Sequence, residues 1–172
     1  MAKQTVGIPA LVNVVTGGTS SDDAYVTLNP HLFMIYEPNE WLVDNGANVH
    51  LCADRSNFVS YQVIHDCSVT MENGSTARVM EIGLVNLKFA SGRVLSLHRV
   101  HHVPSVRRNI LSGSCLVREG YELNFKCNKV VILHLKSFIG KGYLSYGLFK
   151  LYVNHVWNKN LDVDTPNFPN VM

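Results

Sequence analysis

The sequence from Trp41 onward consists of short runs rich in Val, Ile, Leu, Phe and Tyr that alternate with small turn clusters. The spacing of these runs is close to the roughly 8–12 residues that is typical of all-β domains. Residues 93–100 and 121–126 also alternate apolar and polar side chains, as strands with one buried face do. We therefore predict an all-β fold. The candidate turns are Asn73-Gly74, Ser91-Gly92, Cys127-Asn128 and Gly140-Lys141-Gly142.

A single short helix is predicted within residues 112–120. Ser112 can cap its first turn, and Leu116 with Val117 can face the core. Gly120 can end the helix, because glycine readily adopts the left-handed conformation. The predicted fold class is thus all-β with one short helix.

The length of 172 residues suits one domain of ordinary size with terminal segments. Residues 1–38 contain glycines, serines and two prolines without a sustained helical period, so we expect a flexible linker there. The β domain is expected at residues 39–135. Residues 136–172 are expected to form a truncated C-terminal extension, because the chain becomes polar and contains prolines after Val153.

Charge and composition argue against several classes of partner. The 15 basic and 13 acidic side chains give a formal charge of +2, unlike the basic stripe of a dedicated nucleic-acid binder. No direct nucleic-acid contact is expected, because no aromatic residues are interleaved with the arginine cluster of Arg99, Arg107, Arg108 and Arg118. No apolar run approaches the ~20 residues of a membrane helix, and no secretory signal is evident. An intracellular, cytoplasmic location without a membrane partner is therefore expected.

The cysteines and histidines do not have the spacing of a metal site. The four cysteines, Cys52, Cys67, Cys115 and Cys127, form no closely spaced pair, so we expect free core thiols. His101 and His102 are neighbours in an alternating strand and should point to opposite faces of the sheet. We therefore expect neither a metal nor a cofactor.

The segment that carries chemistry is the apolar run 41–43 followed by Asp44, Asn45, Gly46 and Ala47. One interpretation is that this segment holds a carboxylate rigidly at the end of a strand. The simpler interpretation is an ordinary β-turn that follows a strand. Hydrolysis by aspartate needs two carboxyls that share a proton, and the chain offers a single loop of this kind. The second carboxyl would have to come from another copy in a twofold dimer.

A longer series of motifs extends this pattern over about residues 41–126. These motifs are Trp41-Leu42-Val43-Asp44-Asn45-Gly46-Ala47, His50-Leu51-Cys52, Phe58, Met71-Glu72-Asn73-Gly74-Ser75, Ile82-Gly83, Val100, Val103-Pro104, Arg108-Asn109-Ile110-Leu111-Ser112, Leu116 and Glu119-Gly120-Tyr121. In this order they resemble the protease region of Copia-type retrotransposon polyproteins. The stretch 147–151 resembles the junction that leads toward the pre-integrase region in that family.

The resemblance implies a retropepsin-like acid protease β-barrel that is homodimeric and uses no cofactor. It implies an aspartic endopeptidase that cleaves the element's own polyprotein, in the cytoplasm or within element-encoded particles. Asp44 matches the catalytic aspartate, and Gly46 and Ala47 match the active-site turn. Asn45 departs from the pattern, because the family has Ser or Thr at that position, and the amide of Asn has a different length and geometry.

Two further segments acquire roles through the resemblance. The segment 69–79, with its Asn-Gly turn, predicts a hairpin that would be the flap over the substrate, or otherwise an ordinary surface hairpin. The flap residues expected to bind substrate are Met71, Asn73, Gly74 and Ser75. The residues expected to support the active-site loop from behind are Asn109, Ile110, Leu111 and Ser112.

Two alternatives to an active protease stay open. The first is a catalytically degenerate, retrotransposon-derived β domain that dimerises or binds peptide without cleavage, and Asn45 is the residue that favours it. The second is an unrelated all-β binding module in which Asp44 is a turn residue. The second alternative predicts no apolar cluster beneath the loop of Asp44.

Overall fold

The computed structural model describes residues 24–26, 39–71 and 74–156. These residues form a mostly β, barrel-like domain with one short α-helix, which confirms the predicted fold class. The strands before the helix are β1 (Ala24–Val26), β2 (Trp41–Asp44), β3 (Leu51–Cys52), β4 (Phe58–Val63), β5 (Ser68–Met71), β6 (Thr76–Arg78), β7 (Glu81–Phe89), β8 (Val94–His102) and β9 (Asn109–Ser112). The helix α1 (Gly113–Arg118) is followed by β10 (Tyr121–Lys126), β11 (Lys129–His134), β12 (Ser137–Ser145), β13 (Leu148–Leu151) and β14 (Val153–Val156). The 3-10 turn η2 (Arg55–Asn57) precedes β4.

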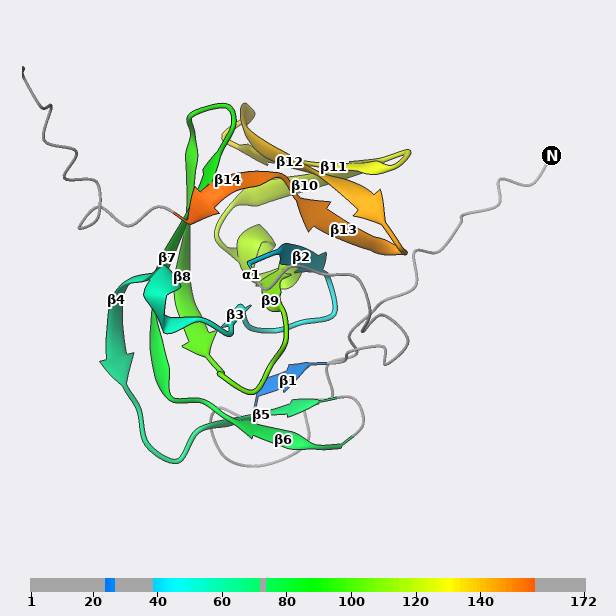
Figure 1. The fold of residues 1–172 in the computed structure, drawn as a ribbon. Helices are drawn as coiled ribbons and strands as arrows, with labels where there is room; N and C mark the ends of the chain where they lie inside the picture. The colour runs from blue at the N-terminus through cyan, green and yellow to red at the C-terminus, as the bar shows by residue number, and fades with distance from the viewer. Residues whose placement is uncertain (1–23, 27–38, 72–73, 157–172) are drawn as a thin grey trace, which may run out of the picture.

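The strands form two sheets. The larger sheet has the order β10-β11-β12-β13-β2-β9-β3-β8-β7-β14, with β4 added beside β7. The smaller sheet has the order β1-β5-β6 and lies at the opposite end of the molecule from β10 to β13 (Figure 1). The strand β2 is thus an inner strand, between β13 and β9.

Two apolar clusters fill the space between these strands. The first contains Trp41 and Val43 of β2 together with Leu116 of α1 and residues of β7, β8 and β11 to β13. The second contains Leu42 and Ala47 together with residues of β5, β6 and β9. Because successive side chains of a strand point to opposite faces, β2 contributes to both clusters and is completely buried.

The helix begins and ends as the sequence predicts. The side chain of Ser112 caps α1 by accepting a hydrogen bond from the amide of Cys115 at 3.1 Å. Leu116 is buried, whereas Val117 is 60% exposed, so only one of the two residues expected to face the core does so. Gly120 has φ = +84°, the left-handed conformation expected at the end of the helix.

Two predicted turns are confirmed and one is wrong. Ser91-Gly92 and Cys127-Asn128 lie in the turns between β7 and β8 and between β10 and β11. Gly140-Lys141-Gly142 instead lies inside β12, whose flanking turns are at residues 135–136 and 146–147. Gly140 and Gly142 permit close packing, because neither has a side chain. A Cβ on Gly140 would overlap the ring of Phe89, and one on Gly142 would lie 2.5 Å from the carbonyl oxygen of Lys150.

The structure also places strands outside the predicted limits of the β domain. Residues 137–156 form β12, β13 and β14, which continue the larger sheet, and β13 pairs directly with β2. Within residues 1–38, the described residues 24–26 form β1, which pairs in parallel with β5. No helix of the described residues is long and apolar enough to cross a membrane.

The four cysteines are free thiols. Only Cys52 is fully buried, while Cys67 and Cys115 are partly exposed and Cys127 is exposed. The expectation of core thiols is therefore right for Cys52 and wrong for Cys127, which lies in the turn after β10 with φ = +52°.

Candidate active site around Asp44

Asp44 is the last residue of β2, at the point where the chain leaves the sheet. The strand pairs in parallel with β9, in a register that sets Asp44 opposite Ser112, and antiparallel with β13. Only 5% of the surface of Asp44 is exposed. The carboxyl is therefore held at the end of an inner strand rather than on a free surface turn.

Burial and two backbone amides determine the acidity of this carboxyl. Its Oδ1 accepts a hydrogen bond from the amide of Gly46 at 2.8 Å. Burial raises the pKa of Asp44 to about 6, although the hydrogen bonds from the Gly46 and Ala47 backbone act in the opposite direction. A carboxyl with this pKa is populated in both protonation states near neutral pH.

The loop after Asp44 is exposed at Asn45, partly exposed at Gly46 and buried at Ala47. The side chain of Asn45 lies over Gly113, the first residue of α1: a Cβ on Gly113 would overlap Asn45 Oδ1 and lie 3.2 Å from Asn45 Cγ. Gly113 was not identified as a site residue from the sequence. Its contact with Asn45 depends on the tertiary fold, which gives no local sequence signal.

Side chains of Ser112 and of helix α1 fix the same loop through hydrogen bonds. The carbonyl of Ala47 accepts hydrogen bonds from the hydroxyls of Ser112 at 2.5 Å and Ser114 at 2.7 Å. The carbonyl of Asn48 accepts a hydrogen bond from the Cys115 thiol at 3.0 Å and another from the Arg118 guanidinium at 3.2 Å. The loop is thus fixed by side chains that come about 65 residues later in the sequence.

The residues expected to support the loop lie beside it. Asn109, Ile110, Leu111 and Ser112 form β9 and are all buried. Ile110 packs in the cluster that contains Ala47, and Leu111 packs in the other cluster. Asn109 Oδ1 accepts a hydrogen bond from the amide of Ala53 at 3.0 Å.

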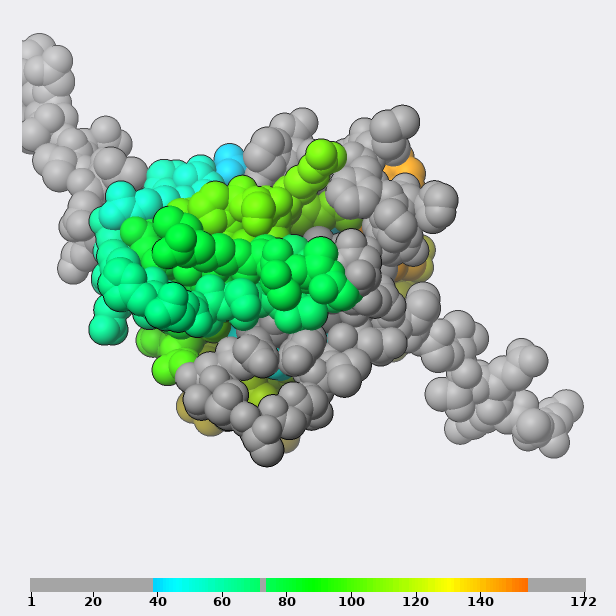
Figure 2. Space-filling view, turned by 90° about the horizontal axis from the view of Figure 1, so that it is seen from below, coloured from blue at the N-terminus to red at the C-terminus, as the bar shows by residue number. Residues whose placement is uncertain are grey.

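The expected flap is a hairpin in the smaller sheet. Its strands β5 and β6 pair antiparallel, and the turn is closed by a hydrogen bond from the Met71 amide to the Ser75 carbonyl at 2.7 Å. Gly74 has φ = +78°, and Asn73 lies outside the described residues. Val69 and Ala77 of the hairpin belong to the apolar cluster of Ala47. Seen from below, the green segments that include β5 and β6 lie on the outer surface (Figure 2).

A cavity of ≈ 780 Å³ opens next to the loop. Its wall includes residues 48–50, which follow the loop, residues 64–68, which lead from β4 into β5, and the residues Arg99 and Arg118. The structure thus brings the Asp44 loop, β9 and the start of α1 together. Of the expected flap residues that it describes, Met71 ends β5 of the neighbouring sheet, and Gly74 and Ser75 precede β6.

His50 is a buried wall residue of this cavity, with 1% of its surface exposed. Its Nδ1 accepts a hydrogen bond from the Ser112 amide at 3.0 Å, and its Nε2 has no hydrogen-bond partner among the described residues. Burial, together with the nearby His101, Arg118 and His98, lowers the pKa of His50 to about 3. The ring is therefore neutral at physiological pH.

The two neighbouring histidines of β8 point to opposite faces, as the alternation predicts. His101 lines the cavity, whereas His102 pairs through Nδ1 with Glu81 Oε2 at 3.1 Å. Within the described part of the chain, no group of three or more His, Cys, Asp or Glu side chains could hold a metal ion.

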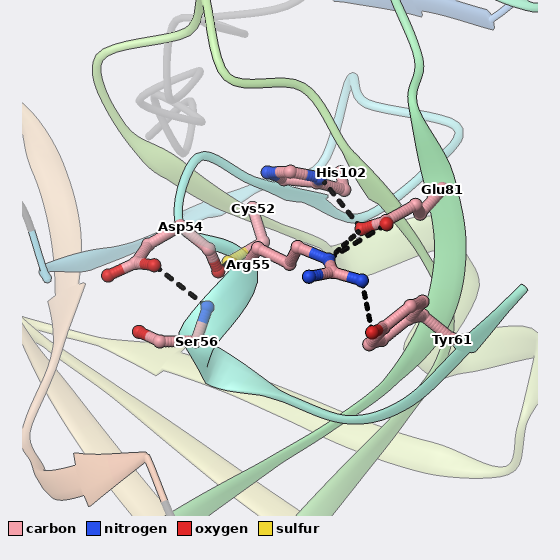
Figure 3. A network of polar contacts seen from close by, with 7 residues as sticks. All are labelled: Cys52, Asp54, Arg55, Ser56, Tyr61, Glu81 and His102. Carbon is pink, nitrogen blue, oxygen red and sulfur yellow. Dashed lines mark hydrogen bonds and ion pairs between the residues drawn. The ribbon is translucent and has the colours of Figure 1, made fainter. Parts of the chain in front are cut away.

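A second polar cluster, which the sequence did not reveal, joins η2 and β4 to β7 and β8 (Figure 3). Glu81 accepts hydrogen bonds from Arg55 Nε at 2.8 and 3.0 Å and also contacts His102. The Arg55 guanidinium lies 4.1 Å from the ring centroid of Tyr61 and bonds its hydroxyl. Because its members are up to 47 positions apart (residues 55 to 102), no local motif marks this cluster.

Comparisons with known proteins add a family context to this geometry. Residues 41–121 match the family described as Pol polyprotein, beta-barrel domain. The chain is 36% identical over 104 residues to the Retrovirus-related Pol polyprotein from transposon TNT 1-94 of Nicotiana tabacum, which covers 60% of this chain and 8% of that protein. It is 33% identical over 78 residues to the corresponding polyprotein from transposon RE1 of Arabidopsis thaliana, which covers 45% of this chain and 5% of that protein.

The matched region begins at the first residue of β2 and ends at the first residue of β10, so it contains the Asp44 loop, the hairpin β5–β6, β9 and α1. The chain spans less than a tenth of the length of the curated relatives it matches. No solved structure matches the chain. Over residues 41–121 the chain is therefore similar to the family described as Pol polyprotein, beta-barrel domain, and it is similar to retrovirus-related Pol polyproteins of plant transposons.

Proposed function

We propose that this chain is an aspartic endopeptidase domain that acts as a homodimer, in which Asp44 of each copy contributes one carboxyl to a shared water. The observation that carries the proposal is the environment of Asp44. Its carboxyl is almost completely buried at the end of an inner strand, with a pKa raised to about 6. Such a group exchanges its proton near neutral pH, as acid–base catalysis of peptide hydrolysis requires.

The second carboxyl of the dyad is proposed to come from a second copy. Burial and backbone hydrogen bonds determine the pKa of Asp44, and no other carboxyl of the described residues contributes to it. Asn45 is exposed and Gly46 is partly exposed, so the loop reaches the surface beside the buried carboxyl. Two such loops can meet across a twofold axis, which would bring the two Asp44 side chains together.

The proposed substrate is an extended peptide of the polyprotein to which the segment belongs, in a Copia-type element. The similar plant proteins are named retrovirus-related Pol polyproteins, which supports a substrate of this class. Met71, Gly74 and Ser75 of the hairpin β5–β6 are proposed to cover the peptide, together with Asn73, which lies outside the described residues. The hairpin packs in the same apolar cluster as Ala47, so this packing couples its position to that of the Asp44 loop. The reaction would take place in the cytoplasm or in element-encoded particles.

The test is cleavage of a peptide library derived from the flanking polyprotein, with the unmodified chain, Asp44→Asn and a control variant, Asp54→Asn. Asp54 is exposed and caps η2 through its side chain, a role that Asn can also fill. We expect cleavage by the unmodified chain and by Asp54→Asn, and none by Asp44→Asn. Equal cleavage by all three proteins would contradict the proposal, as would activity that does not depend on a dimer in sedimentation measurements.

A second candidate function is a degenerate domain that dimerises or binds peptide without cleavage. The observation that favours it is the side chain of Asn45, which lies against Gly113 of its own chain at a position where the resemblance has Ser or Thr. Asn45→Ser tests it directly. If Asn45→Ser cleaves the library and the unmodified chain does not, the degenerate domain is the correct interpretation. Peptide binding without cleavage by either protein would also favour it.

A further inference from the structure

The outer face of strands β10 to β13 carries a row of lysines and a tyrosine. The register of the antiparallel pairs sets Lys126 opposite Lys129, Lys129 opposite Tyr143, and Tyr143 opposite Lys150. Side chains of directly paired residues lie on the same face of a sheet. These four residues therefore form one row across four neighbouring strands, at the end of the molecule away from β5 and β6 (Figure 1).

A second row lies next to the first. It runs from Asn124 through Val131 to Lys141, and the amide of Tyr152 bonds the carbonyl of Lys141 at 2.9 Å. Tyr143 is 36% exposed and Tyr152 is 59% exposed. Two aromatic side chains thus lie on the solvent side of this sheet. The apolar side chains on its other face are packed in the first apolar cluster.

Cations surround the ring of Tyr143. Lys129 Nζ lies 5.8 Å and Lys141 Nζ lies 5.5 Å from the ring centroid, which is within the range of cation–π attraction. These two lysines lower the pKa of the Tyr143 hydroxyl, the hydrogen bond with Lys141 being the main cause. The positive charge of the face is therefore concentrated around its aromatic side chain.

Carboxylates neutralise little of this charge. Lys150 pairs with Glu40 beside the row. Lys126, Lys129 and Lys141 take part in no ion pair among the described residues. Glu122 is two residues before Asn124 on the same edge strand, beyond the second row. Three ammonium groups without a carboxylate partner form a surface that is complementary to a polyanion.

We propose that this face, made of Lys126, Lys129, Lys141, Tyr143 and Tyr152, binds single-stranded nucleic acid. The rings of Tyr143 and Tyr152 would stack on bases, and the three lysines would contact the phosphates. Exposed aromatic rings interleaved with cations are the combination that single-stranded binding platforms use, because every base has a stacking face and every nucleotide has a phosphate. An acidic peptide would satisfy the lysines but would leave the rings without a partner.

No local motif indicates this surface, because its residues come from four separate segments between positions 126 and 152. The arginines considered from the sequence have no interleaved aromatic residues. The lysines and tyrosines are brought together only by the register of β10 to β13. The surface is distinct from the Asp44 loop, so the proposal is independent of the proposed peptidase activity.

The experiment is fluorescence anisotropy of a labelled twelve-nucleotide oligo(U) RNA and the matching oligo(dT) DNA with the full chain. The variants are Lys129→Ala/Lys141→Ala, Tyr143→Leu and Tyr143→Phe, and the charge-matched control is Arg78→Ala/Arg93→Ala, which removes two exposed cations outside these strands. We expect the lysine pair to lower the affinity and to reduce the salt slope by about 1.4, since each phosphate contact to a single strand contributes about 0.7. Tyr143→Leu should lower affinity about tenfold, and Tyr143→Phe should retain it, because stacking needs the ring.

The outcomes separate the proposal from its rivals. Loss of affinity in the lysine pair and in Tyr143→Leu, but not in the arginine control, supports it, and the comparison of RNA with DNA identifies the preferred sugar. Equal losses in both charge pairs would overturn it, because they would indicate nonspecific attraction to the whole protein. No binding of either oligonucleotide, or binding only to phosphatidylserine vesicles in a sedimentation assay, would also overturn it. Circular dichroism melting of each variant establishes that the variants are folded.

Discussion

The backbone amide of Ser112 donates a hydrogen bond to Nδ1 of the buried His50 at 3.0 Å. Because Nδ1 accepts, the neutral ring carries its proton on Nε2. The bond joins the segment after the Asp44 loop to the residue that both pairs with Asp44 and caps α1. A protonated His50 could not accept it, so the pairing is compatible only with the neutral ring.

His50 should make the protein less stable in acid. Its folded pKa of about 3 lies below the ordinary value of 6.5, so the unfolded chain binds the proton more readily. The resulting contribution to stability is complete above pH 6.5 and is lost as pH falls toward 3, with a total on the order of 5 kcal/mol. We expect His50→Asn, which does not titrate but can accept from the Ser112 amide, to remove this pH dependence in urea unfolding.

The control for this prediction is His50→Leu. It also removes the titration, but it leaves the buried amide of Ser112 without an acceptor, at a cost of about 1–3 kcal/mol at neutral pH. An unfolding free energy at pH 7 that is the same for His50→Asn and His50→Leu would show that the hydrogen bond contributes nothing. An unchanged acid dependence in His50→Asn would refute the role of the ring.

Asp44 should have the opposite pH dependence. Its folded pKa of about 6 lies above the ordinary 3.8, so the folded protein binds the proton more readily between these values. The stability that comes from the protonated carboxyl is present below pH 3.8 and is lost as pH rises through 6, by roughly 3 kcal/mol. Asp44→Asn should therefore gain stability relative to the unmodified chain as pH rises from 4 to 7.

The measurement is the difference in unfolding free energy between Asp44→Asn and the unmodified chain at several pH values. The difference cancels the contribution of His50, which is common to both proteins. Asp54→Asn is the matched control, because it makes the same chemical change at an exposed residue outside the Asp44 loop. A constant difference for Asp44→Asn across this range would mean that the carboxyl is ionised in the folded protein at pH 4.

Gly140→Ala should destabilise the fold by about 1–3 kcal/mol, because the added methyl group would overlap the buried ring of Phe89. The neighbouring Lys141→Ala adds nothing to the core and should change the unfolding free energy little, since Lys141 is exposed. Phe89→Leu creates space at the same place, so the double variant should lose less stability than the sum of the two single changes. Strictly additive losses in a double-mutant cycle would exclude the contact as the cause.

Local patterns in the sequence were sufficient for the strand-rich class, the turn at Ser91-Gly92 and the helix capped by Ser112. Each of these depends on residues that are adjacent or a few positions apart. The pattern failed at Gly140, where glycine serves a contact with Phe89 and not a turn. A single sequence cannot distinguish these two uses of glycine, because the partner is 51 positions away (140 minus 89).

The candidate site likewise has one part that the local sequence predicts and another that it does not. The position of Asp44 at a strand end could be read from the apolar run before it and the glycine after it. Its burial between β9 and β13, the contact of Asn45 with Gly113 and the bond from Ser112 to His50 all depend on strand order, which the local pattern does not contain. The pKa of Asp44 follows from that burial and was therefore equally out of reach.

The buried carboxylate of Glu81 should stabilise the fold more than an exposed acid does. It accepts two hydrogen bonds from Arg55 Nε and contacts Nδ1 of the buried His102 (Figure 3). Glu81→Ala removes these partners at once and should cost about 2–3 kcal/mol, mainly because His102 is left in the core without its acceptor. Arg55→Ala should cost less, about 1 kcal/mol, because the Arg55 side chain is 53% exposed and its charge is screened by water.

Urea unfolding of four variants checks the order of these effects. Glu81→Gln retains an oxygen acceptor and should fall between Glu81→Ala and the unmodified chain. Glu122→Ala removes an exposed acid from β10 and should change stability by less than about 0.5 kcal/mol. Arg55→Ala leaves the contact between Glu81 and His102 intact. If it nevertheless cost as much stability as Glu81→Ala, then the exposed ion pair, and not the buried contact with His102, would hold η2 and β4 against β7.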